Sequence, residues 1–494
     1  MESLLEVRIR ERDAKDRRRA IMSSGNEQKN EGAGAKGAAN GQNTQAANTH
    51  KLKFSEKIAY GMGDSAANVY VAMTGSFLTG FYTDTVGLAA AAVGTMMLVT
   101  RVFDGITDLL MGGIVEKTHT RWGKARPWVL WTAPFMALGL ILLFTVPKSL
   151  YGTNGGLIYA YITYIFMNCL VYTANNLPFN ALLSRMSLDV QDRADTASVR
   201  FIMTQITTLI VNAVTASLVS SVGWVTLAVI YGLIEVVMLL WCFFGCKEHI
   251  GEDEESKTVK TEKVPMKVGL KAVLTNKYFY FQALLFLVLY IYVVCIGSST
   301  YYFCNTVLGN LSIMTVISSA MTIAAIISNF IVPYGVRKFG KRICMIAGCI
   351  LVIIGSAVVG LAGTNIALVV VGQLIRGFGQ GPIMSGIFAM TADIVDYGEW
   401  KKGIRTEGLV NSATSFGMKV GIGLGSAVCT GILSIGGYVG TAEVQTASAI
   451  ASIKFAFGYM GVITMVICLI LVLLLNLDKY MPQIQKDLKA KHNM

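Results

Sequence analysis

The sequence predicts an all-α membrane protein with twelve transmembrane helices in two six-helix bundles. Hydrophobic residues make up 53% of the 494-residue chain, and charged residues only 15%. Runs of about 20 apolar residues recur along the chain, each long enough to cross a hydrocarbon core about 30 Å thick. A charged segment at 246–277 separates these runs into two sets of six. Composition therefore favours a membrane protein before any motif is considered.

The expected spans follow one another with polar loops between them. They comprise residues 58–82, 88–115, 127–147, 157–182, 200–222, 224–245, 278–302, 312–333, 342–362, 366–392, 408–435 and 452–477. This pattern gives five parts: a disordered polar N-terminal tail (1–51), an N-terminal bundle (52–245), a cytoplasmic linker (246–277), a C-terminal bundle (278–480) and a cytoplasmic C-terminal tail (481–494). The tail is rich in Gly, Ala, Asn and Gln, which cannot build a core.

Topology, rather than nucleic-acid binding, explains the net charge of +12. Basic residues gather in every second loop, at 121–126, 185–193, 247–277, 337–342 and 401–405, whereas the other loops carry almost none. Loops rich in Lys and Arg stay on the cytoplasmic side of a membrane. The pattern predicts a multi-pass protein of the cell membrane with both termini in the cytoplasm.

Three charges interrupt the second expected span, MMLVTRVFDGITDLLMG. Arg101, Asp104 and Asp108 follow the spacing i, i+3 and i+7, which places them on one face of an α-helix. Each costs about 2.5–3.5 kcal/mol on insertion scales unless it faces a protein interior. Buried acids of this kind hold Na⁺ or H⁺ in ion-coupled transporters, and Asp104 and Asp108 are candidates for a Na⁺ site. The alternative is an ion-pair network between helices.

The sequence gives little support to an enzyme. The four histidines, His50, His119, His249 and His492, all lie outside the expected spans, and no HExxH or DxD string occurs. The nine cysteines are scattered, without metal-ligand spacing. The glycine strings GFGQG and YGMG lack the strand and the GKS/T of a nucleotide loop. We expect no cofactor besides a coupling ion. The sequence does not set the oligomeric state, and a monomer is compatible with it.

Several strings together resemble one family. YGMGD, FYTDTVGL, RVFDGITDLLMG, TRWGKARPW and NNLPFNALLSRM occur in that order in the first half, and MTADIVDYGEWKKGIRTEGL and MKVGIGLG in the second. They are similar to the glycoside–pentoside–hexuronide:cation symporters of the major facilitator superfamily, over about residues 52–480. The resemblance implies two six-helix bundles around a midplane cavity, and secondary transport of a sugar with a cation.

The resemblance also implies a cation site. The family's paired acids match Asp104 and Asp108, a hydroxyl on the fourth helix matches Thr173, and a lysine on the eleventh matches Lys419. Carboxylates and a hydroxyl supply hard oxygen ligands. Lys419 or Arg101 would offset their negative charge when the cation is absent.

A sugar site is implied at Asn68, Tyr172, Asn176, Asn180 and Arg200. Melibiose permease, the best-known family member, has Asp at the positions of Asn68 and Asn176 and Trp at that of Asn180. The Asn-Leu-Pro string at 176–178 fits family members that carry glucuronides or xylosides better. Arg200 is able to bind a uronate carboxylate, to hydrogen-bond a neutral sugar, or to pair with another helix.

Further charges are candidates for gating, or for topology alone. Arg376, beside Gln373 and Gln380, is expected to face the cavity, to contact sugar or the other half. Glu235 has no family counterpart and fits an ion-linked site, a helix contact or a water-filled pocket. The expected gating and charge network comprises Arg101, Arg121, Lys124, Arg126, Asp393, Asp396, Glu399 and Arg405.

The sequence thus predicts a symporter that moves a glycoside, pentoside or hexuronide with Na⁺ or H⁺ by alternating access. The alternative is an uncoupled facilitator or a transporter-like sensor, against which intact Asp104 and Asp108 argue. A membrane-embedded enzyme is the remote alternative.

Overall fold

The computed structural model describes residues 51–492 apart from 188, 250–272, 274 and 404–406. Within these residues the regular elements are helical, and one isolated bridge joins Thr120 to Gly123. The predicted tail 1–51, except Lys51, and most of the predicted linker lie outside the described residues. The all-α prediction is confirmed for the part of the chain that is described.

The helices of residues 54–245, called the N-terminal group here, fill the first half of the chain. In order they are α2 (Phe54–Met73), η1 (Thr74–Leu78), η2 (Phe81–Thr85), α3 (Ala90–Lys117), α4 (Arg126–Leu143), η3 (Lys148–Leu150), α5 (Asn154–Ile165), η4 (Phe166–Tyr172), α6 (Thr173–Met186), α7 (Val190–Val222) and α8 (Trp224–Gly245). Most of the η segments are π-helical turns that continue a neighbouring α-helix, as η4 does between α5 and α6.

The helices of residues 277–474 form the C-terminal group. They are α11 (Lys277–Tyr302), η5 (Phe303–Val307), α12 (Ile313–Phe339), α13 (Lys341–Leu361), α14 (Ile366–Lys402), α15 (Glu407–Ile435), α16 (Ala447–Lys454), η6 (Phe455–Tyr459) and α17 (Met460–Leu474). One more helix, α18 (Met481–His492), follows where a C-terminal tail was expected. It buries Met481, Ile484 and Leu488 and packs against α14.

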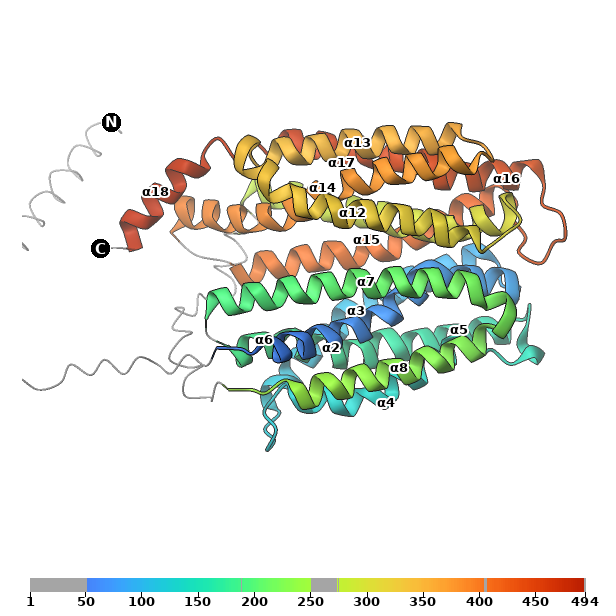
Figure 1. Cartoon of the computed structure of the whole chain (residues 1–494), viewed down its shortest axis with the longest axis horizontal. Helices are drawn as coiled ribbons and strands as arrows, with labels where there is room; N and C mark the ends of the chain where they lie inside the picture. Colours follow the sequence, from blue (N-terminus) through green and yellow to red (C-terminus); the bar gives the residue numbers. More distant parts are fainter. Residues whose placement is uncertain (1–50, 188, 250–272, 274, 404–406, 493–494) are drawn as a thin grey trace, which may run out of the picture. The chain divides into compact units, whose positions relative to one another are not determined.

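The long helices lie side by side and alternate in direction (Figure 1). We call the end that carries residues 117–126, 185–193 and 337–342 the basic end; it lies at the left of Figure 1. The opposite end, which carries η2 and α16, is called the Asp84 end. Ten helices of the described residues are long and apolar enough to cross a membrane. The helices that begin at Phe54 and Ala90 are not among these ten.

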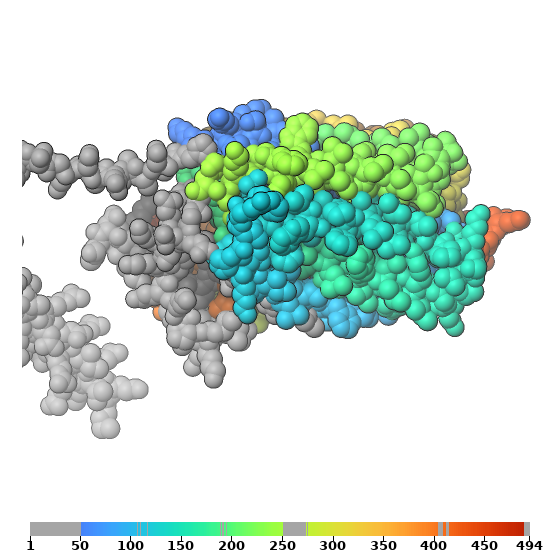
Figure 2. Space-filling model, turned by 90° about the horizontal axis from the view of Figure 1, so that it is seen from below, coloured from blue at the N-terminus to red at the C-terminus, as the bar shows by residue number. Residues whose placement is uncertain are grey.

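The outer surface of the helices is apolar, as lipid contact requires. On α8, Leu233, Val237, Trp241 and Phe244 expose more than half of their surface. Figure 2 shows α8, in yellow-green, on the outside of the face that the N-terminal group presents. A continuous face of exposed apolar side chains is unfavourable in water. Glu235 of the same helix is fully buried instead.

Glycines bring α3 and α15 into direct contact. A Cβ at Gly423 would lie 3.2 Å from the Leu98 Cα, and one at Gly94 would lie 3.1 Å from the Ala427 Cα. Small residues allow such approach of membrane helices. The contact joins the N-terminal group to the C-terminal group and places Lys419 of α15 beside the charged face of α3.

Candidate functional site

Asp104 is the most buried charge of the α3 face, since its side chain is only 1% exposed. The Thr173 hydroxyl of α6 donates to its Oδ1 at 2.9 Å. The Arg101 guanidinium, one turn earlier on α3, lies 3.4 Å from its Oδ2. A buried carboxylate needs such partners, because an unpaired one would cost several kcal/mol. The predicted approach of Thr173 and Arg101 to Asp104 is therefore present in the structure.

Lys419 lies between the two acids of α3. Its Nζ is 3.2 Å from Asp104 Oδ2 and is also in direct ionic contact with Asp108 Oδ2. Asp108 is 30% exposed at its side chain and Lys419 16%, so this end of the cluster is more open than Asp104. Arg101 and Lys419 together balance the two carboxylates. The ammonium group occupies the space between the oxygens that would hold a cation.

A second polar cluster of the N-terminal group centres on Arg200 of α7. Its Nε lies 2.8 Å from Asp64 Oδ2 and its Nη2 3.0 Å from Asp64 Oδ1, so the acid holds the guanidinium by both oxygens. Arg200 Nη1 donates to Asn180 Oδ1 at 2.8 Å and, at 3.4 Å, to the Tyr60 hydroxyl. The guanidinium also lies over the ring of Phe179, 5.4 Å from its centre.

A chain of hydrogen bonds extends this cluster along the fourth helical segment. The Asn180 side-chain amide donates to Asn176 Oδ1, and the Asn176 amide donates to the Tyr172 hydroxyl at 2.7 Å. Asn68 donates to the backbone carbonyl of Asp64 at 2.9 Å. Asn68 lies on α2, one turn from Asp64, and the hydrogen bonds join the other four predicted sugar-site residues, Tyr172, Asn176, Asn180 and Arg200. Their amide and hydroxyl groups suit the hydroxyls of a sugar.

Arg376 does not face the central region, contrary to expectation. It is fully buried inside the C-terminal group, where its Nε donates to the Ser356 hydroxyl and its Nη1 to Gln373. Its Nη2 donates to the backbone carbonyls of Phe457 and Gly458 in η6. A π-helical turn leaves carbonyls without their usual partners, and Arg376 satisfies two of them. Arg376 therefore lies apart from the predicted sugar-site residues of the N-terminal group.

Several of the expected gating charges have partners within their own half of the chain. The Glu248 carboxylate accepts the backbone N–H groups of Lys124, Ala125 and Arg126, which caps the start of α4. In the C-terminal group Lys341 contacts Asp393 at 2.5 Å. Arg121 lies over the ring of Trp122, 4.5 Å from its centre. Asp396 and Glu399 both take part in further interactions. Arg405 lies outside the described residues.

The structure places three acids that the sequence analysis did not assign to a site: Asp64, Glu248 and Glu235. Asp64 precedes Asn68 by four residues on α2, so the helical spacing that singled out Asp104 and Asp108 would have found it as well. Glu248 had no such signal, because it follows the last apolar residue of α8. Neither carboxyl oxygen of Glu235 has a hydrogen-bond partner within the described part of the chain.

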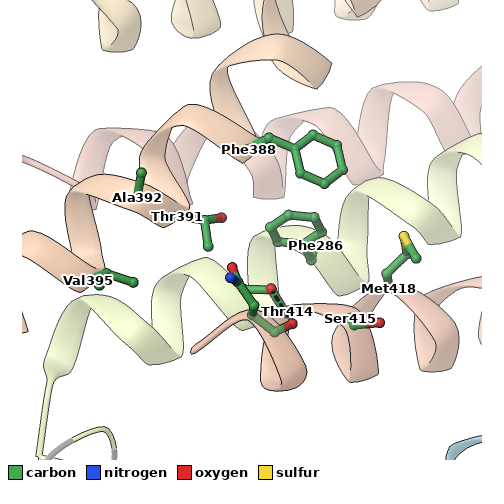
Figure 3. A pocket seen from close by; sticks show the side chains of 9 residues that line it. Phe286, Phe388, Thr391, Ala392, Val395, Thr414, Ser415 and Met418 are labelled. Atoms are coloured by element: carbon green, nitrogen blue, oxygen red, sulfur yellow. Dashed lines mark hydrogen bonds between the residues drawn. The ribbon is translucent and has the colours of Figure 1, made fainter. Parts of the chain in front are cut away.

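Two cavities lie among the helices, one inside the C-terminal group and one between the two groups. One, of about 340 Å³, lies among α11, α14 and α15, where Phe286, Phe388, Thr391, Thr414 and Ser415 line it (Figure 3). The other, of about 490 Å³, separates α7 from α12 between Phe201 and Ile326. Farther along these two helices, toward the Asp84 end, the hydroxyls of Ser217 and Thr315 are 3.0 Å apart. The helices thus touch near the Asp84 end and part toward the basic end.

Antiparallel apolar helices enclose buried ion pairs and a cluster of amide and hydroxyl side chains that suits a sugar. This combination is typical of a membrane transporter. Residues 59–479 match the family model described as MFS/sugar transport protein, and the chain belongs to this family. This confirms the resemblance to the glycoside–pentoside–hexuronide:cation symporters. The family and the relatives below are transporters, not enzymes.

The chain is similar in sequence to several named transporters over most of its length. The isoprimeverose transporter of Lactiplantibacillus pentosus is 32% identical over 453 residues, 89% of this chain and 92% of the relative. The glucuronide carrier protein homolog of Escherichia coli K12 is 29% identical and covers 82% of this chain and 88% of its own. The putative glycoside/cation symporter YagG of the same strain is also 29% identical and covers 84% and 90%.

Solved structures show the same fold at low identity. A bacterial homologue of the human lysosomal transporter Spinster, in an inward-facing and unoccupied conformation, superposes with a TM-score of 0.63 at 12% identity. The match covers 85% of this chain and 95% of that one.

Proposed function

We propose that the protein is a secondary active transporter that moves a sugar together with Na⁺ or H⁺ by alternating access. The observation that carries this proposal is the cluster of Asp104, Asp108 and Thr173 closed by Lys419 from the other group of helices. The names of its relatives, which include a glycoside/cation symporter, a glucuronide carrier and an isoprimeverose transporter, support a sugar as the transported molecule.

The proposed architecture is twelve spans in two six-helix bundles, one formed by each group of helices. The helices that begin at Phe54 and Ala90 would be the two spans beyond the ten apolar ones. These two helices carry Asp64, Arg101, Asp104 and Asp108, and a span tolerates such charges when they pair inside the protein. The basic end would lie in the cytoplasm by the positive-inside rule. The parting of α7 and α12 toward that end then makes this an inward-open conformation.

The proposed coupling runs through Lys419. A cation that binds Asp104, Asp108 and Thr173 must displace the ammonium group, because both need the same oxygens. Since Lys419 belongs to α15 and the acids to α3, cation binding would replace an ionic contact between the two bundles. Binding at this site and the relative motion of the bundles are thereby linked.

The proposed sugar site consists of Asn68, Tyr172, Asn176, Asn180 and Arg200, on the N-terminal bundle. For the outward-facing conformation we propose that the basic loop at 121–126 pairs with the acids at 393–399. In the present conformation the basic loop contacts Glu248.

One observation favours a second candidate, an uncoupled facilitator. Lys419 already neutralises both acids, so the carrier could reorient without any ion. Uptake of labelled xylosides, glucuronides and galactosides into proteoliposomes separates the two functions. Each sugar is tested with an inward Na⁺ gradient, an inward H⁺ gradient, or neither. Accumulation above equilibrium under one gradient supports the symporter and names the ion. Equilibration alone supports the facilitator, and the absence of flux for every sugar contradicts both.

A further inference from the structure

The ion pair between Asp64 and Arg200 changes what the sugar site is able to recognise. Asp64 takes the side of the guanidinium formed by Nε and Nη2, at 2.8 and 3.0 Å, and Nη1 is bonded to Asn180. The rings of Tyr60 and Phe179 lie beside the guanidinium, 5.8 and 5.4 Å from it. Arg200 is therefore fixed in orientation, and its charge is balanced before any substrate arrives.

We propose that this pair makes the site selective for uncharged glycosides, with Asp64 as the acceptor for a sugar hydroxyl. The inference rests on the proposed function, because it assumes that the cluster around Arg200 is the sugar site. Asp64 would be a specificity-determining residue one helical turn from Asn68, where the sequence alone placed the contact.

Hydroxyl chemistry matches such a pair. A sugar hydroxyl both donates and accepts, so it can donate to Asp64 and accept from Arg200 at the same time. The other members of the hydrogen-bond chain, Asn180, Asn176 and Tyr172, are uncharged and also suit hydroxyls.

An acidic substrate would meet the opposite situation. A uronate carboxylate has no proton to donate to Asp64, and it would bring a second anion beside a guanidinium that one carboxylate already neutralises. Like charges at such distances repel strongly in a partly buried site. Either the substrate carboxylate must displace Asp64, which then loses its partner, or the site must hold a net negative charge.

Paired substrates test this inference directly. The p-nitrophenyl glucosides and xylosides and the matching p-nitrophenyl glucuronide, in both anomeric forms, compete against the labelled sugar that wild-type proteoliposomes accumulate. We expect the best uncharged glycoside to inhibit uptake at least about tenfold more strongly than the glucuronide of the same anomer. This comparison needs no variant, so it does not depend on how a variant folds.

Variants then assign the selectivity to Asp64. Asp64→Asn should lower the preference for the uncharged glycoside about tenfold or more, because the charge of Arg200 is then no longer balanced by a carboxylate. Asp64→Glu should retain the preference. Asp195→Asn serves as the matched control, because Asp195 lies on α7, is 48% exposed at its side chain and contacts Lys57 rather than Arg200. The apparent affinity for the coupling cation should stay the same in all three, which a merely structural defect would not leave unchanged.

Three results would overturn the inference. A wild-type preference for the glucuronide would do so while leaving sugar transport established. An Asp64→Asn protein that weakens both ligands equally would show that Asp64 has no part in selectivity. Failure of every sugar to enter the vesicles would remove the proposed function, and this inference with it.

An independent feature lies at the other end of the molecule, around Asp84 in η2. The Tyr438 hydroxyl donates to Asp84 Oδ1 at 2.8 Å and the Asn305 amide to Oδ2 at 2.9 Å. Both donors belong to the C-terminal half of the chain, whereas Asp84 belongs to the N-terminal half. The Thr83 hydroxyl also donates to Asp84, and it lies 3.0 Å from the Tyr302 hydroxyl.

We infer that Asp84 fastens the two halves together at this end in the present conformation. The hydrogen-bond donors to its carboxylate named above are uncharged, so the contact opens by exchanging these donors for water rather than by breaking an ion pair. Packing around it is close, since a Cβ at Gly440 would lie 2.3 Å from the Thr83 carbonyl oxygen. The Gly75 carbonyl accepts from Ser298 at 3.1 Å and adds a contact nearer the centre.

Spin labels at two exposed sites of this end, Asn154→Cys and Val444→Cys, report its opening in a cysteine-free background. Tyr438→Phe and Asp84→Ala should shift the distance distribution toward longer separations, with the larger shift for Asp84→Ala. Glu443→Gln, an exposed acid of the same end, is the control and should leave the distribution unchanged. Identical distributions for the wild type and both variants would overturn the assignment.

Discussion

The charges on α3 show how one helical face acquires partners from two other helices. Arg101, Asp104 and Asp108 follow helical spacing, and Thr173 and Lys419 complete the cluster. The two acids differ in their surroundings. Asp104 is held by a hydroxyl and two cationic groups, whereas the more exposed Asp108 has, among the described residues, an ionic contact with Lys419.

Neutralising either acid of α3 should uncouple transport. Asp104→Asn or Asp108→Asn removes a charged oxygen ligand, so we expect gradient-driven accumulation to fall at least about tenfold while some sugar binding remains. Uptake driven by the cation gradient in proteoliposomes measures the accumulation, and calorimetry in detergent measures the sugar binding. Normal accumulation by both variants would show that these acids do not couple.

Glu235 permits a prediction in the opposite direction. It is fully buried in α8 and neither oxygen has a hydrogen-bond partner within the described residues. An unsatisfied buried polar group costs about 1–3 kcal/mol, so Glu235→Met should raise thermal stability in detergent. Uptake should remain as in the wild type, with Glu235→Gln as the isosteric control. Loss of coupling in both variants would instead identify Glu235 as a second ion-linked site.

Among the elements, the turn between α3 and α4 requires a glycine at position 123. Gly123 has a φ of +105°, in the region that favours glycine. Its Cα faces the Glu248 carboxylate, and a Cβ there would lie 2.3 Å from Glu248 Cδ. The RWGKARPW string thus needs its glycine for both conformation and space.

Substitution of this glycine should destabilise the basic end. Gly123→Ala combines a strained φ with a clash against Glu248, which together should cost about 2 kcal/mol or more. A thermal-shift assay in detergent measures the loss, with Gly112→Ala as the control, because a Cβ at Gly112 meets nothing within 4 Å. Equal stability of the two variants would contradict this account of the turn.

The start of α7 gives a pH-dependent contact outside the membrane spans. The backbone N–H of Leu52 and the Lys57 ammonium donate to Asp192 and hold the pKa of that carboxyl below its usual value. A lowered folded-state pKa stabilises the protein above about pH 4 and loses this effect as the pH falls through the folded-state pKa.

Asp192→Asn should therefore lower the melting temperature at pH 7 by about 1–2 °C, because it removes the charged acceptor of Leu52 and Lys57. The difference from wild type should shrink below about pH 4, and melting curves from pH 3 to pH 8 measure it. A difference that is constant over this range would show that the charge of Asp192 plays no part.

At the scale of the whole molecule, the two groups of helices meet at the Asp84 end and part toward the basic end. Ser217 of α7 and Thr315 of α12 touch near the former, and a cavity of about 490 Å³ separates the same helices farther along. Alternating access requires this contact to open while the other end closes.

A covalent bond at this contact should stop the transport cycle. In a cysteine-free background, Ser217→Cys with Thr315→Cys should form a disulfide under oxidation, because the two hydroxyls are 3.0 Å apart. Uptake should then fall to background and return after reduction with dithiothreitol, while each single variant stays active under both conditions. Undiminished uptake by the cross-linked protein would mean that this contact does not open during transport.

Much of the fold was predictable because its signals are local. Apolar runs of membrane length, alternating basic loops and the spacing of Asp104 and Asp108 are all read from short stretches of chain. The prediction missed two features of the structure, although their helical spacing is also local. It treated residues 481–494 as a tail although Met481, Ile484 and Leu488 follow helical spacing, and it passed over Asp64.

The sequence by itself thus determined a helical membrane transporter, its family and the charged face of α3. Only the tertiary structure decided which groups meet: Lys419 contacts acids more than 300 residues earlier, Arg200 is held by Asp64, and Arg376 is buried against η6. The physical reason is that helical periodicity fixes which side chains share a face, whereas the partner of that face depends on how helices pack. A charge within an apolar helix indicates that a polar partner would stabilise it, but only the packing of the helices decides which residue lies beside it.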